Sequence, residues 1–179
     1  MNNLQVKYQK ELVPQLKEKF DLKNLMTVPR LKKVVINVGM GRFSKEKDYI
    51  ENVEKALSAI SGQKPVLTKA KKSISGFKLR EGMIVGAMVT LRKKRMYDFV
   101  EKLVDVTFPR VRDFRGINQT SVDGSGNLTV GIKEHTAFAE IGLDDTDNIF
   151  GLEITLVTNC KNREEGLELF KQLGFPFKK

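Results

Sequence analysis

The 179-residue chain has one cysteine, one histidine and no tryptophan, and these scarcities exclude several kinds of site. A single cysteine, Cys160, cannot form an internal disulfide or a cysteine-rich zinc site, and it suits a reducing compartment. A single histidine, His135, excludes the paired-histidine metal motifs. No apolar run reaches about 18 residues and the first 20 residues carry charges throughout, so we expect neither a membrane span nor a secretory signal. We therefore expect a cytoplasmic protein without a metal or cofactor.

Positive charge is in excess and is unevenly distributed. The 32 lysines and arginines outnumber the 22 aspartates and glutamates, which gives a net charge of +10. Residues 64–95 hold 10 basic side chains and one acidic one, whereas residues 134–168 hold 2 basic and 9 acidic ones. A distribution that served only solubility would interleave the two signs. The basic segment is therefore expected to bind an anionic partner, with nucleic acid first and a membrane surface second.

Hydrophobic periodicity predicts helices and strands within a single domain, residues 1–179. Alternating apolar residues predict strands over 31–39, 65–68, 83–93, 128–132 and 152–157. Helical spacing predicts a first helical segment over 8–20, which Pro14 kinks or starts, and a second helix that Gly62 stops. It also predicts a helix over 95–107 that Pro109 ends. A last helix is predicted to be capped by Asn162, with Glu165 three residues further on. Asp123 and Gly126 belong to a predicted hairpin turn.

Each longer strand has one apolar and one polar face. Such strands favour a mainly antiparallel or mixed sheet with helices on one side, which is a two-layer α+β sandwich with an open face. The polar positions expected on the open face are Lys33, Asn37, Gln63, Thr90, Arg92, Thr129 and Lys133. This face is either a platform for RNA or an ordinary solvated surface, and the pattern alone supports both.

The strongest local signal is a basic loop of about fifteen residues (residues 69–83), longer than most connections in compact domains. It contains the side chains Lys69, Lys71, Lys72, Ser73, Phe77, Lys78 and Arg80. Lysines can bind phosphates, serines can donate hydrogen bonds, and Phe77 can stack on a base or ribose. The alternative is a mobile solvated loop with Phe77 tucked away.

Three other motifs give weaker signals. Gly39-Met40-Gly41 resembles a dinucleotide-binding fingerprint, but Ser44 replaces the third glycine and no acidic residue ends the next strand. A tight turn with Ser44 as helix cap is the preferred interpretation. The acidic segment 143–148 lacks the glycine and distal glutamate of a calcium loop, so a surface for a basic protein is favoured. His135 beside Glu134 has no nucleophile motif near it, so we expect neither an enzyme nor a small-molecule substrate.

Four blocks in order, residues 33–39, 67–82, 110–116 and 150–154, resemble the bacterial form of the large-subunit ribosomal protein five family. The resemblance runs nearly from end to end. It implies an α+β domain in the central protuberance of the large ribosomal subunit. It also implies that the protein binds 5S ribosomal RNA and joins it to the large ribosomal RNA.

The resemblance further implies which residues make contacts. The RNA-binding residues correspond to Lys33, Asn37, Gln63 and Thr90, and Arg92 lies on the same predicted face. The basic loop is implied to reach the elbow of the peptidyl-site transfer RNA. Another edge is implied to form an intersubunit bridge with a basic protein of the small-subunit head. The candidates for this bridge are Arg110, Arg112, Asp144, Asp145 and Asp147, although charge leaves the segment 110–115 open to ribosomal RNA as well.

Overall fold

Five strands form a single sheet in the computed structural model, which describes residues 3–43, 46–142 and 148–178. The hydrogen-bonded order is β2-β3-β1-β5-β4. The strands are β1 (Leu31–Gly39), β2 (Val66–Lys69), β3 (Ile84–Leu91), β4 (Leu128–Ile132) and β5 (Leu152–Thr158). The chain divides into two compact units, residues 1–34, 91–130 and 155–179 in the first and residues 35–90 and 131–154 in the second.

Neighbouring strands run antiparallel, as local hydrogen bonds show. β2 and β3 pair antiparallel, with Val66 opposite Met88. At the end of β1, the Met40 N–H donates to the carbonyl of Val85, near the start of β3, over 2.9 Å. The Asn159 N–H, just after β5, donates to the Arg30 carbonyl, just before β1. The predicted α+β class with a mainly antiparallel sheet is therefore confirmed.

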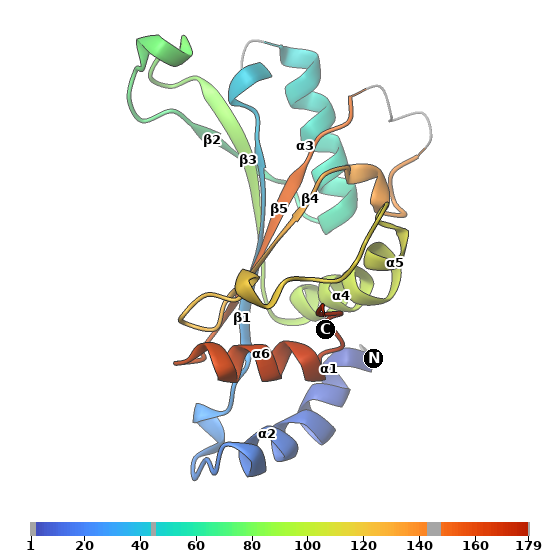
Figure 1. The fold of residues 1–179 in the computed structure, drawn as a ribbon. Coiled ribbons are helices and arrows are strands. Elements are labelled where there is room, and N and C mark those ends of the chain that lie inside the picture. The colour runs from blue at the N-terminus through green and yellow to red at the C-terminus, as the bar shows by residue number, and fades with distance from the viewer. Residues whose placement is uncertain (1–2, 44–45, 143–147, 179) are drawn as a thin grey trace. The chain divides into compact units, whose positions relative to one another are not determined.

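In the second unit, helix α3 (Lys47–Ser61) covers the apolar side of the strands (Figure 1). Its predicted apolar stripe is buried, with Val53 and Leu57 inaccessible to solvent. Gly62 ends the helix with φ +64, and its N–H donates to the Ser58 carbonyl over 2.9 Å. A left-handed residue at this position favours glycine, so the predicted stop is confirmed. The N-cap position is Glu46, and the expected cap, Ser44, lies outside the described residues.

The first unit contains the remaining helices, which are α1 (Asn3–Lys7), α2 (Val13–Lys19), α4 (Lys93–Lys102), α5 (Phe108–Arg110) and α6 (Arg163–Gln172) (Figure 1). Their core contains Phe108 and Phe170, whose rings both meet Phe175 at centroid distances of 6.0 and 5.3 Å. The Tyr8 ring lies 6.0 Å from Tyr97, and its hydroxyl donates to the Pro29 carbonyl over 2.8 Å. Burial raises the pKa of Tyr8 far above its usual value, so the hydroxyl stays protonated and keeps donating.

Two prolines follow π-helical turns, and this corrects one prediction. Pro14 is the second residue of α2, as expected for a start, but Pro109 does not end its helix, because α5 continues to Arg110. A proline lacks the N–H for the carbonyl four residues earlier, and its ring collides with that carbonyl. In the π-helical turns 8–12 and 103–107 the hydrogen bonds reach five residues back instead of four, from the Val13 N–H to the Tyr8 carbonyl and from the Phe108 N–H to the Leu103 carbonyl. The wider turn leaves space for the proline ring that follows.

The cap of α6 also differs in detail from the prediction. Asn162 is the N-cap residue, but its side chain makes no capping bond. Instead, the Glu165 carboxylate accepts a hydrogen bond from the Lys161 N–H over 3.0 Å. The predicted turn at 123–126 is confirmed, with the Asp123 carboxylate accepting from the N–H groups of Ser125 and Asn127. These bonds hold the pKa of Asp123 below its usual value despite some desolvation.

Candidate nucleic-acid interface

The sheet has one buried and one solvent-facing side, as the alternation along β1 shows. Val34, Ile36 and Val38 are buried, whereas Lys33, Val35 and Asn37, which alternate with them, are only half-buried. On β3, Val89 is buried and the adjacent Thr90 is half-buried. Because successive side chains of a strand point to opposite faces, these polar groups lie on the side away from the buried layer.

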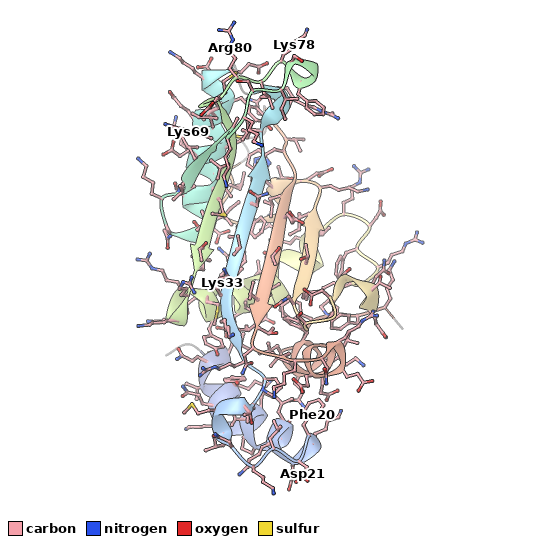
Figure 2. The ribbon with its side chains drawn as sticks, turned by 90° about the vertical axis from the view of Figure 1, so that its left-hand side faces the viewer. Phe20, Asp21, Lys33, Lys69, Lys78 and Arg80 are labelled. Carbon is pink, nitrogen blue, oxygen red and sulfur yellow. The ribbon has the colours of Figure 1, made fainter. Side chains whose placement is uncertain are left out.

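Within the second unit, Asn37 and Thr90 lie on the neighbouring strands β1 and β3. Gln63 belongs to the same unit, but it lies in the connection between α3 and β2 and not on a strand. Within the first unit, Lys33 lies on β1 (Figure 2), and Arg92 is exposed just before α4. Thr129 and Thr155, also in the first unit, bring their hydroxyls to 3.3 Å on β4 and β5.

The basic loop has a hydrogen-bonded structure of its own. Ile74 and Leu79 exchange two backbone hydrogen bonds of 3.0 and 3.1 Å, which enclose a one-turn 3₁₀ helix over Ser75–Phe77. Nearer the strands, the Ala70 N–H donates to the Met83 carbonyl over 2.8 Å. The loop is thus an extension of the β2–β3 hairpin, which its irregular sequence did not indicate.

Cationic and apolar side chains of the basic loop are presented to solvent. Phe77 is 74% exposed, so the alternative in which Phe77 is tucked away is wrong. Lys71, Lys72 and Lys78 are also exposed, and Figure 2 shows Lys69, Lys78 and Arg80 around this end of the unit. A hollow of about 860 Å³ in the loop is lined by Ser73, Ser75, Lys78, Leu79, Arg80 and Met83. Cations, hydroxyls and an exposed ring are the groups that bind phosphates, sugars and bases.

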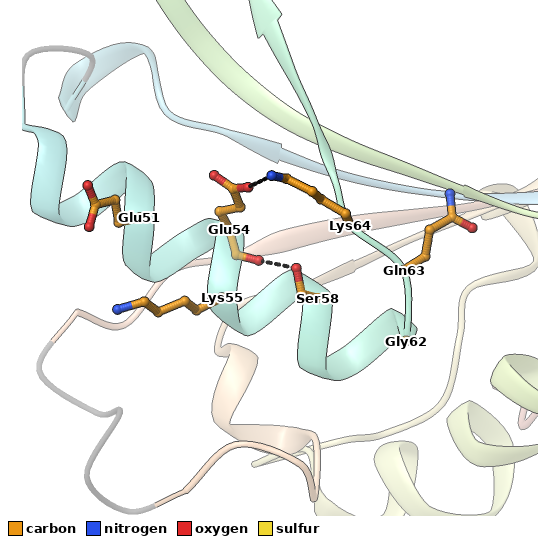
Figure 3. A pocket seen from close by; sticks show the side chains of 7 residues that line it. All are labelled: Glu51, Glu54, Lys55, Ser58, Gly62, Gln63 and Lys64. Carbon is orange, nitrogen blue, oxygen red and sulfur yellow. Dashed lines mark hydrogen bonds and ion pairs between the residues drawn. The ribbon is translucent and has the colours of Figure 1, made fainter.

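A second, shallow depression lies beside α3 (Figure 3). It measures about 740 Å³ and is lined by Glu51, Glu54, Lys55, Ser58, Gly62, Gln63 and Lys64. The Lys64 ammonium lies 3.4 Å from the Glu54 carboxylate, and the Ser58 hydroxyl donates to the Glu54 carbonyl. Charges of both signs therefore line it, and it lacks the concentrated positive charge of the basic loop.

His135 has a structural role. It is 1% exposed, and its ring stacks on Phe150 with centroids 4.0 Å apart. Its backbone N–H donates to the Phe150 carbonyl over 3.0 Å, which joins the segment after β4 to the one before β5. The dinucleotide pattern is likewise structural, because Met40 is fully buried and Gly41 begins a 3₁₀ turn.

The bridge candidates are only partly described. Arg110 and Arg112 are exposed at the end of α5 and just beyond it, where Phe114 stacks on Phe108 at 5.0 Å. Asp144, Asp145 and Asp147 lie outside the described residues. Over the three described ranges, no group of three or more histidine, cysteine, aspartate or glutamate side chains could hold a metal ion. In that same part of the chain, no helix has the length and apolarity needed to cross a bilayer.

The fold and the two surfaces define the class: an α+β protein with a polar sheet face and a basic hairpin extension. Comparison with known proteins is consistent with this class. A family model described as "Ribosomal protein L5" matches residues 24–80, and a second model, which describes the C-terminus of the same ribosomal protein family, matches residues 84–177. The chain belongs to the ribosomal protein L5 family.

Curated relatives match the chain along its length. It is 52% identical over 177 residues to the large ribosomal subunit protein uL5 of Halothermothrix orenii, with 99% of each chain covered. It is 53% identical over 178 residues to the uL5 protein of Desulforapulum autotrophicum and 51% identical over 178 residues to that of Streptococcus thermophilus, again with 99% coverage. The family resemblance inferred from the four sequence blocks is confirmed.

Membership of this family fixes the general role of the chain. It is a structural constituent of the large subunit of the cytoplasmic ribosome, its partner is ribosomal RNA, and it is not an enzyme. The nucleic-acid partner expected from the charge is therefore confirmed.

Proposed function

We propose that the chain binds 5S ribosomal RNA with the polar face of its sheet and joins it to the large ribosomal RNA in the central protuberance. One observation carries the proposal: along β1, buried Val34, Ile36 and Val38 alternate with the partly exposed Lys33 and Asn37. A rigid apolar layer thereby holds polar side chains toward solvent. Such preorganisation lowers the entropy that binding would otherwise cost.

The chemistry of this face suits folded RNA. An RNA helix presents a wide, shallow minor groove with base edges and 2′-hydroxyls. The Asn37 amide can both donate to and accept from these groups, the Thr90 hydroxyl can do the same, and the Lys33 ammonium can bind a phosphate. Gln63 in the second unit and Arg92 in the first unit are assigned as further RNA-binding residues.

The basic loop is assigned to the elbow of the peptidyl-site transfer RNA. The Ser73 hydroxyl accepts a hydrogen bond from the Glu81 N–H, and the Lys78 N–H donates to the Ser75 carbonyl. Phe77 adds an exposed ring, and Lys69, Lys71, Lys72 and Arg80 add positive charge. An elbow exposes phosphates, sugars and base edges, for which lysines and an exposed ring are suitable partners.

The intersubunit bridge is assigned to the edge that carries Arg110 and Arg112 and to the acidic residues Asp144, Asp145 and Asp147. Residues 134–168 hold 9 acidic and 2 basic side chains, a balance that suits a basic protein of the small-subunit head. Acidic groups would repel RNA, so this segment is expected to face protein.

We expect Asn37→Ala and Thr90→Val each to weaken binding to a 5S RNA transcript about tenfold at fixed salt, the typical loss for a base-edge or close sugar contact. Thr90→Val keeps the shape of the side chain and removes only the hydroxyl. Both positions are half-buried on a solvent-facing side, so the midpoint of thermal unfolding should change little. Electrophoretic mobility-shift titration measures the affinity.

Asn52→Ala is the matched control, because Asn52 is exposed on α3, which covers the opposite side of the strands in the same unit. This variant should bind like the unchanged protein. If Asn37→Ala and Thr90→Val also bind unchanged, the sheet face does not contact 5S RNA.

A further inference from the structure

Two adjacent apolar side chains, Leu25 and Met26, are presented to solvent in the first unit. They are 59% and 70% exposed and begin the 3₁₀ turn η2 (Leu25–Thr27), in the chain just before β1. The residues that follow, Val28 and Pro29, are buried. The chain therefore turns inward directly after it presents this pair, and the unit does not cover the two side chains.

The turn that carries the pair is fixed from its N-terminal side. The Asn24 side-chain oxygen accepts a hydrogen bond from the Met26 N–H over 2.9 Å. The Asn24 carbonyl accepts two more, from the N–H of Thr27 at 3.1 Å and from its hydroxyl at 2.7 Å. Asn24 thus sets the backbone direction of the Leu25–Met26 segment.

The turn is also fixed from its C-terminal side, by residues distant in sequence. The Asn159 amide donates to the Val28 carbonyl over 3.0 Å and accepts from the Arg30 N–H over 2.6 Å. The Tyr8 hydroxyl donates to the Pro29 carbonyl between these contacts. A segment bonded on both sides holds its exposed side chains outward and loses little freedom when a partner covers them.

The charges around the pair favour RNA as that partner. Exposed cations precede and follow it in Lys23, Arg30 and Lys32, and Lys33 of the proposed RNA face comes next along β1. Asp21 is the acidic residue nearest in sequence. Charged residues are depleted at the centre of protein interfaces, whereas methionine and leucine beside lysines and arginines are the composition of apolar wedges that contact nucleic-acid bases.

We propose that Leu25 and Met26 form an apolar wedge that packs against base planes of the bound ribosomal RNA, with Lys23 and Lys32 beside it on the phosphates. The proposal rests on the 5S RNA binding proposed above and adds to it a contact that is apolar. The sheet face contributes hydrogen bonds and charge, and the wedge contributes contact with unpaired or unstacked bases.

The test compares three variants of the full chain against a 5S RNA transcript over a salt series. The double variant Leu25→Ser/Met26→Gln should lose about tenfold or more in affinity, the scale of one lost base–side-chain stack. Its salt dependence should be unchanged, because no phosphate contact is removed. Lys23→Gln/Lys32→Gln should instead flatten the salt dependence. Leu25→Ala/Met26→Leu, which keeps an apolar side chain at both positions, should restore most of the affinity.

Val106→Thr is the control, because Val106 is 39% exposed in the helical turn 103–107 of the same unit and lies outside both the proposed wedge and the sheet face. It should bind normally, and all variants should keep the unfolding midpoint, since each replaced side chain is exposed. If Thr90→Val weakens binding and Leu25→Ser/Met26→Gln does not, the wedge is wrong and the sheet face stands. If neither weakens binding, the proposed 5S function fails and the wedge fails with it. The wedge would also be wrong if Leu25→Ser/Met26→Gln weakened binding and flattened its salt dependence in the way that Lys23→Gln/Lys32→Gln does.

Discussion

Gly166→Ala will destabilise the fold by about 3 kcal/mol, the upper part of the usual range for an overpacked site. A Cβ at this position of α6 would lie 2.5 Å from the Gly126 Cα and 2.6 Å from its carbonyl oxygen. Both atoms belong to the backbone, so no side-chain rotation can relieve the collision. The Gly126 carbonyl is also held in place, because it accepts the Thr158 hydroxyl over 2.9 Å.

Urea unfolding followed by circular dichroism measures this loss. Gly131→Ala is the control, because a Cβ there meets nothing within 4 Å, and its stability should stay within about 0.5 kcal/mol of the unchanged protein. A Gly166→Ala protein as stable as this control would contradict the close approach of α6 to the turn at Gly126. We also expect a single transition for residues 1–179, since one domain is predicted, and two separate transitions would argue against that prediction.

Replacing Lys71, Lys72 and Lys78 together by glutamine is expected to weaken the binding of peptidyl-site transfer RNA to reconstituted large subunits about tenfold at low salt. All three side chains are exposed on the basic loop, and the Lys78 N–H that donates to the Ser75 carbonyl is a backbone group that glutamine retains. Removing these charges should also flatten the salt dependence. Binding to 5S RNA should change by less than about twofold, because the sheet face is untouched.

The matched control is a triple variant in which Lys7, Lys10 and Lys55 are replaced by glutamine. It removes the same charge from exposed helical positions outside the proposed interface, so it separates a local contact from a change in net charge. Transfer-RNA binding should then stay near that of the unchanged protein. Equal losses of 5S and transfer-RNA binding in the loop variant would mean that loop and sheet form one site.

The sequence predicted well the parts of the fold that depend on local periodicity. Alternation along 31–39 identified which residues of β1 are buried, and helical spacing with a left-handed Gly62 identified α3 and its end. Both follow from the geometry of one element. The continuation past Pro109 was missed, because a π-helical turn widens the helix without any compositional mark. The order within the basic loop was also missed, since two bonds between Ile74 and Leu79 create no period.

Local periodicity likewise predicted one part of the candidate site, the polar sheet face, and missed the exposed pair Leu25 and Met26. Lys33, Asn37 and Thr90 could be placed on a polar face, because a period of two determines the face. Leu25 and Met26 could not be found in this way, since their exposure depends on contacts from the distant Asn159 and Tyr8. The signal available in the sequence is Asn24, a residue that favours turns, immediately before two apolar residues.

Directed hydroxyl-radical cleavage tests the central claim most directly, namely that the polar side of the sheet faces 5S RNA. An iron chelate would be attached to Gly39→Cys, at the exposed end of β1 where a Cβ meets nothing within 4 Å, in a chain carrying Cys160→Ser. The same chelate on Lys55→Cys would probe the outer side of α3 in the same unit. We expect specific cleavage of bound 5S RNA from position 39 and none from position 55. Cleavage from position 55 with none from position 39 would contradict the account.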